Sequence, residues 1–139
     1  MSLRAIPLII IPFVLYNVIV LLGGSGAPQD ILNTAIFSIP MLSSGAKWVF
    51  TWGDFIILVL LLVLFVELLK STYTSTASLL DHGLSMLVFI AALIEFLLVK
   101  QAATSTFFFI MMAGIIDVIA GYTIGIRVAR RDLSIGGNE

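Results

Sequence analysis

Residues 55–66 read FIILVLLLVLFV, a run of 12 side chains without a single polar or small residue. The run lies inside the apolar segment 54–69. A helix that crosses a bilayer needs about 20 mostly apolar residues. We therefore expect segment 54–69 to span a membrane, and this stretch decides the class of the protein.

The composition of the whole chain supports the same class. Of its 139 residues, 60% are hydrophobic and 11% are charged, whereas soluble domains average about 45–50% and about 25%. So short a chain cannot bury that much apolar surface in a water-facing core, which argues against a soluble enzyme. The net charge of −1 provides no basic excess for nucleic acid. The absence of cysteine excludes disulfides, thiolate nucleophiles and metal–sulfur sites.

Three further segments have the length and hydropathy of membrane spans, namely 6–22, 79–99 and 105–126. Together with 54–69 they predict an all-α integral membrane protein. We expect one membrane domain over residues 1–139, built as an antiparallel bundle of four transmembrane helices. Residues 127–139 would follow it as a cytoplasmic tail.

Segment 6–22 has an alternative interpretation. Arg4 precedes it and small residues follow it at 23–27, which together resemble a signal peptide and its cleavage site. Pro28 directly follows that site and would hinder cleavage, so we expect a retained helix. Within this helix Pro12 removes a backbone donor and predicts a kink.

The connection between the first two spans contains a predicted amphipathic helix at residues 28–39. Pro28 and Asp30 are typical of a helix start, and Pro40 ends the pattern. Five apolar residues recur on one face: Ile31, Leu32, Ala35, Ile36 and Ile39. The segment is too short to span, so we expect it to lie on the extracytoplasmic surface of the membrane.

The basic residues predict the orientation of the chain, because they concentrate on the cytoplasmic side of membrane proteins. With four spans, one side carries Arg4, Lys70, Arg127, Arg130 and Arg131, and the other carries Lys47 and Lys100. Both termini are therefore expected in the cytoplasm. The three arginines of the tail would anchor the last span at lipid head groups or dock a partner.

Asp117 is the strongest candidate for a functional residue, because an ionisable group inside a membrane helix costs about 2.5–3.5 kcal/mol. It lies near the middle of segment 105–126. Gly114 and Gly121 lie close to it around the helix, and Gly121 and Gly125 form a small-xxx-small pattern that lets another helix approach. Asp117 should therefore face a helix interface, either to fix packing or to titrate during proton or cation movement.

Further polar candidates lie in or beside the other spans. Asp81 and Glu95 fall on one face of segment 79–99, since 14 residues at 100° each return to within about 40°. His82 follows Asp81 and could respond to pH. Glu67 could pair with Lys70 three residues on, and Asn17 could bond to a neighbouring helix. If their faces converge, Glu67, Asp81, His82 and Asp117 would form an acidic site in the cytoplasmic half of the membrane.

Two functional classes follow from these residues. The chain contains no motif of a known catalytic or nucleotide-binding site, so we expect no enzyme activity, cofactor or metal. The first class is a non-catalytic interaction or accessory subunit of a membrane assembly. The second is a homo-oligomer that conducts or transports protons or cations through Asp117 and the carboxylates of Glu67, Asp81 and Glu95.

Overall fold

The structure, a computed structural model, describes residues 5–73 and 75–137. Of the described residues, 73% are helical. Within the described residues, three helices are long and apolar enough to cross a membrane: α3 (Trp52–Lys70), α4 (Thr76–Leu98) and α5 (Ser105–Gly136). They cover three of the four apolar segments, and they are consistent with an integral membrane protein.

Helix α1 (Ile10–Leu22) is shorter than the predicted segment 6–22 and has 13 residues. The preceding residues leave the helix because their backbone groups bind side chains of α3, as described below. The reason given for a kink at Pro12 does not hold in the structure. Pro12 lies in the first turn of α1, where a backbone N–H has no helical acceptor, so the missing donor leaves no bond broken.

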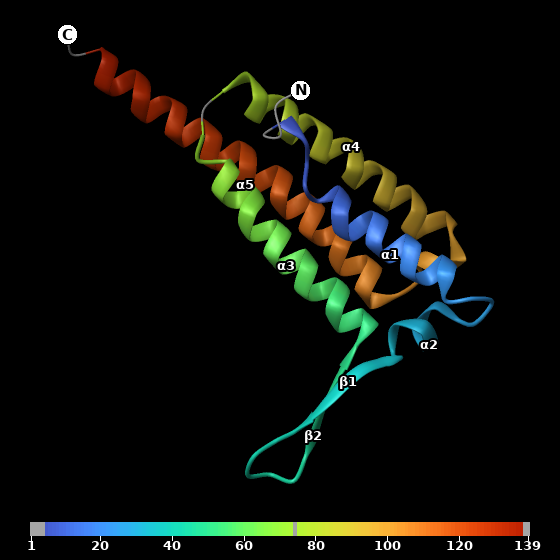
Figure 1. Ribbon diagram of the computed structural model, residues 1–139. Helices are drawn as coiled ribbons and strands as arrows, with labels where there is room; N and C mark the ends of the chain where they lie inside the picture. The colour runs from blue at the N-terminus through green and yellow to red at the C-terminus, as the bar shows by residue number, and fades with distance from the viewer. Residues whose placement is uncertain (1–4, 74, 138–139) are drawn as a thin grey trace.

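Helices α1, α3, α4 and α5 lie side by side and are here called the helical body (Figure 1). Helix α5 packs against both α3 and α4, and α1 packs against α3. We call the end of the body at which α3 finishes and α4 begins the cluster end, because a cluster of charged side chains lies there. At the opposite hairpin end lie α2, two β-strands and the short 3-10 helix η2 (Lys100–Ala102) (Figure 1).

The half of the helical body nearer the hairpin end has an apolar interior around Phe107. This side chain is 0% exposed, and its ring centroid lies 5.0 Å from that of Tyr16 and 6.0 Å from that of Phe13. The Tyr16 hydroxyl donates to the carbonyl of Gln101 at 2.6 Å. It also lies 2.7 Å from the hydroxyl of Thr104, the N-cap of α5. These contacts join α1 to the connection between α4 and α5.

The predicted amphipathic helix at 28–39 is wrong over most of its length. Helix α2 covers only Pro28–Leu32. Strand β1 (Ala35–Pro40) then pairs antiparallel with β2 (Lys47–Thr51), and Gly45 takes the positive φ of 70° in the connection between them. Strand β1 contains Ile36, Phe37 and Ile39, residue types that favour strands. Pairing with β2 therefore decided for the strand periodicity over the helical one. The fold is therefore mostly helical rather than all-α.

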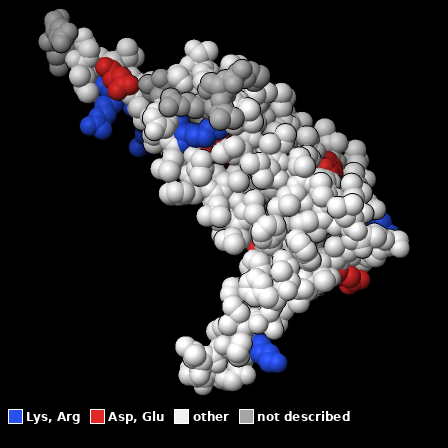
Figure 2. All heavy atoms as spheres, viewed as in Figure 1, with Lys and Arg blue, Asp and Glu red and all other residues white. Residues whose placement is uncertain are grey.

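The expected tail 127–139 is also helical over most of its length, because α5 continues through Gly136. Arg127, Arg130 and Arg131 are exposed on this extension, which projects beyond the helical body at the cluster end (Figure 1). Figure 2 shows a face of the helical body that is largely uncharged between its two ends. Arg4 and residues 138–139 lie outside the described part of the chain.

Candidate functional site

Lys70, at the end of α3, holds a buried ion-pair network at the cluster end. Its ammonium group donates to Oε1 of Glu67 and to Oδ1 of Asp81, each at 2.9 Å. Glu67 is 0% and Asp81 1% exposed. The connection between α3 and α4 spans only residues 71–75, so it brings the end of one helix beside the start of the next. The network therefore ties α3 to α4.

The segment before α1 completes this network with its backbone. The amide of Leu8 donates to Glu67 Oε1 at 2.7 Å, and the carbonyl of Ile6 accepts from Lys70 at 2.9 Å. An ammonium group has three hydrogens to donate, and Lys70 uses them on Glu67, Asp81 and Ile6. Residues 6–8 form a bend and the start of a turn rather than part of α1, and the backbone groups of Ile6 and Leu8 bond to side chains of α3 instead of within a helix.

Asp117 on α5 lies next to this network, and no described residue forms an ion pair with it. It is 0% exposed and is close enough to Glu67, His82 and Lys70 to interact with them electrostatically. The hydroxyl of Ser85 on α4 is also near. Among the described residues, neither carboxyl oxygen of Asp117 has a partner with good hydrogen-bond geometry, and neither does Ser85 Oγ.

His82 lies between this buried group and the surface. It is 2% exposed, and both ring nitrogens lack a partner among the residues described. Its ring packs beside Tyr122 at a centroid distance of 5.3 Å. It also lies against Gly121, where an added Cβ would come within 2.6 Å of Nδ1. Only a residue without a side chain leaves room for the imidazole at this position.

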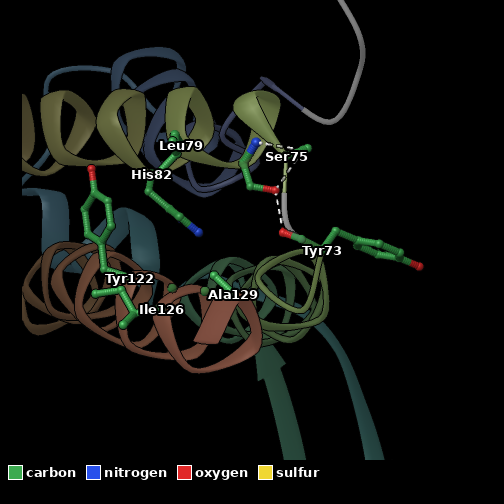
Figure 3. Close-up of a pocket in the computed structure, with 10 residues that line it drawn as sticks. Tyr73, Ser75, Leu79, His82, Tyr122, Ile126 and Ala129 are labelled. Atoms are coloured by element: carbon green, nitrogen blue, oxygen red, sulfur yellow. Dashed lines mark hydrogen bonds between the residues drawn. The ribbon is translucent and has the colours of Figure 1, made fainter. Parts of the chain in front are cut away.

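A cavity of about 250 Å³ opens beside His82 between the start of α4 and the later turns of α5. Figure 3 shows the imidazole projecting from α4 into this space, with Tyr122 and Ile126 on the opposite wall. Leu79 and Gly125 also line it. The cavity connects the surface at the cluster end with His82, behind which Asp117 is buried.

The structure therefore brings together four of the five predicted proton or cation candidates: Glu67, Asp81, His82 and Asp117. Glu95 is not among them. It lies half-buried towards the hairpin end of α4, where Asn17 of α1 is its polar neighbour. The side chain of Asn17 also donates to the carbonyl of Phe13 at 3.1 Å. Asp81 and Glu95 share a helix face but lie near opposite ends of α4.

The three glycines predicted to pack helices differ in their surroundings. Gly121 is in close contact with His82, as described above. A Cβ at Gly114 would be in ordinary contact with Phe89 of α4, at 3.7 Å, whereas a Cβ at Gly125 would meet no described residue within 4 Å. In the described part of the chain, Gly114 and Gly121 therefore lie against α4, and Gly125 does not.

Sequence reasoning missed the contact between Lys70 and Asp81 and the backbone groups of residues 6–8. The first could have been found from the short polar connection between the helices, which forces their ends together. The second has no side-chain signal. Across residues 5–73 and 75–137, no three His, Asp or Glu side chains are arranged to hold a metal ion.

Neither a family model, nor a curated protein, nor a solved structure matches this chain. Function must therefore be argued from the site itself.

Proposed function

We propose that this chain is a membrane protein of four spanning helices, which form a bundle and bind a proton or a monovalent cation at the Asp117 site to move it across the membrane. The single observation that carries this proposal is the convergence of three buried carboxyl groups from three helices around one lysine. Glu67 comes from α3, Asp81 from α4 and Asp117 from α5.

The balance of charge supports a bound cation or proton. If all three carboxyl groups were ionised, Lys70 would neutralise one of them, and His82 could neutralise a second only by taking up a proton. A buried charge without a partner is costly, more so in a membrane. A proton on Asp117, or a small cation beside it, removes this cost. Ser85 Oγ and the imidazole of His82 lie near Asp117 and, among the described residues, have no hydrogen-bond partner with good geometry, so both are placed to take part in binding.

The surroundings of the site support movement of the bound species. Towards the cluster end, the cavity beside His82 leads to the surface. Towards the hairpin end, the apolar interior around Phe107 and Tyr16 closes the helical body. The site is thus near one surface and sealed from the other. Transport requires that this seal opens when the bound species crosses, which is the alternating exposure expected of a transporter.

Replacing Asp117 by Asn is expected to reduce flux to the level of protein-free vesicles. The amide keeps the shape of the carboxyl group but cannot take up a proton or balance a cation. The measurement is pH-gradient-driven proton and monovalent-cation flux in liposomes that contain purified protein. Asp30→Asn is the matched control, because Asp30 is exposed at the hairpin end. Unchanged flux in Asp117→Asn, with Asp30→Asn also unchanged, would remove the transport proposal.

The orientation that we propose has both termini in the cytoplasm, so the cluster end faces the cytoplasm and the hairpin end faces outward. The support is the excess of basic residues at the cluster end. A reporter enzyme that is active only outside the cytoplasm, fused after residue 139, should be inactive. A second fusion, in the connection between Pro40 and Lys47, should be active. The opposite pattern would contradict this orientation.

A second candidate, an accessory subunit of a larger membrane assembly, is favoured by the extension of α5. Its exposed arginines, Arg127, Arg130 and Arg131, are suited to bind acidic lipid head groups or an acidic partner. For either function we propose self-association or assembly with other chains, since four helices enclose little volume. Native mass measured after mild-detergent extraction distinguishes a homo-oligomer from a complex with other proteins.

A further inference from the structure

The β1–β2 hairpin has one aromatic face and one more polar face, and the strand register separates them. Phe37 pairs with Phe50 and Ile39 with Trp48, so these four side chains project to the same side of the hairpin. The opposite side carries Ser38, Pro40, Lys47 and Val49.

The aromatic face holds together through ring contacts and yet remains exposed. The ring centroids of Phe37 and Phe50 lie 4.8 Å apart, and those of Trp48 and Phe50 lie 5.6 Å apart. Phe37 is still 44% exposed and Trp48 48%. Nothing within the described part of the chain covers this face. An apolar patch of this kind normally meets a membrane or a partner.

The position of the hairpin favours the membrane. Strand β2 ends at Thr51 and α3 begins at Trp52, with no linker between them. Thr51 and Asp54 cap the helix reciprocally, which makes this junction rigid. The base of the hairpin is therefore held at the level where a candidate spanning helix begins. Figure 1 shows the hairpin standing out sideways from the helices rather than continuing their line.

We infer that the aromatic face of the hairpin binds the lipid head-group layer at the hairpin end, so that the hairpin lies along the membrane surface. Trp and Phe are suited to this layer, because large rings there contact acyl chains while polar groups stay hydrated. Further aromatic residues follow at the start of α3, where the ring centroids of Trp52 and Phe55 lie 6.0 Å apart. Lys47 and Ser38 on the opposite face would contact water and phosphate groups.

The two tryptophans of the chain, Trp48 and Trp52, make this inference testable by fluorescence. The variant Trp52→Phe retains Trp48 as its single tryptophan, on the aromatic face. In vesicles of phosphatidylcholine brominated near the top of the acyl chains, its emission should be strongly quenched. The matched control carries Trp52→Phe, Trp48→Phe and Val49→Trp, and reports from the opposite face of the same strand. It should be quenched less by bromine and more by aqueous iodide.

Two results would overturn the inference. The first is quenching by brominated lipid that is equal on the two faces, or stronger on the Val49 face. The second is weak quenching of Trp48 that increases when the protein is diluted with lipid, because a second copy of the chain would then cover the aromatic face. Elution of both variants as the same species in detergent shows that the substitutions leave the fold intact.

Discussion

Replacing Lys70 by Met is expected to destabilise the folded protein by about 3–5 kcal/mol, the usual cost of removing one partner from a buried ion pair. Glu67 and Asp81 would keep their buried positions and lose the ammonium group that each contacts at 2.9 Å. Met retains a long apolar side chain, so the loss reports on charge and hydrogen bonding rather than on volume. The free energy of unfolding in mixed micelles measures the effect.

The control for this prediction is Lys100→Met, the same change at an exposed lysine of η2, which should have little effect. The triple variant Lys70→Met, Glu67→Gln, Asp81→Asn should regain much of the stability, because positions 67 and 81 then carry no charge that has lost its partner. A single variant Lys70→Met that is as stable as Lys100→Met would show that the network does not hold α3 and α4 together.

Replacing Phe107 by Ala is expected to cost about 3–5 kcal/mol, as large-to-small changes of buried aromatic residues do. Phe107 is 0% exposed and contacts the rings of Tyr16, Phe13 and Phe96. The space left by the missing Phe107 ring would lie in the apolar interior that closes the helical body towards the hairpin end. Under the proposed function, the variant should therefore also raise the passive proton leak of vesicles that contain it.

Phe109→Ala is the matched control for Phe107, two residues along the same helix. Phe109 is 51% exposed on the outer surface of the helical body, so its removal should change the stability and the leak little. Equal loss of stability in the two variants would contradict the packing described here. A destabilised Phe107→Ala without a larger leak would support the packing but not the role of this region as the seal.

The membrane class and the three long helices could be predicted because hydropathy is a sum over neighbouring residues. The burial of Asp117 followed from the small residues near it on α5. The hairpin could not be predicted in the same way. Residues 35–39 fit the periodicity of a helix and contain strand-forming residues, and the choice depended on pairing with Lys47–Thr51, a partner that local patterns do not identify.

The four residues of the candidate site, Glu67, Asp81, His82 and Asp117, could be named from the sequence, but only on the condition that their helix faces converge. Which of them meet depends on the rotation of each helix about its own axis, and packing sets that rotation. Gly121 shows how, since its missing side chain lets His82 of α4 lie against α5. Glu95 shows the limit, because it shares a face with Asp81 yet lies far along α4 and meets Asn17 instead.

The amino-acid sequence by itself determined that this chain has a helix suited to lipid, since 12 consecutive side chains of α3 are apolar. It also determined which ionisable groups lie on the apolar helices. Only the tertiary structure decided which of these groups neutralise one another. Lys70 pairs with both Glu67 and Asp81, whereas no residue in the described part of the chain forms an ion pair with Asp117. The reason is that electrostatic interaction depends on distance between atoms, which helix packing sets.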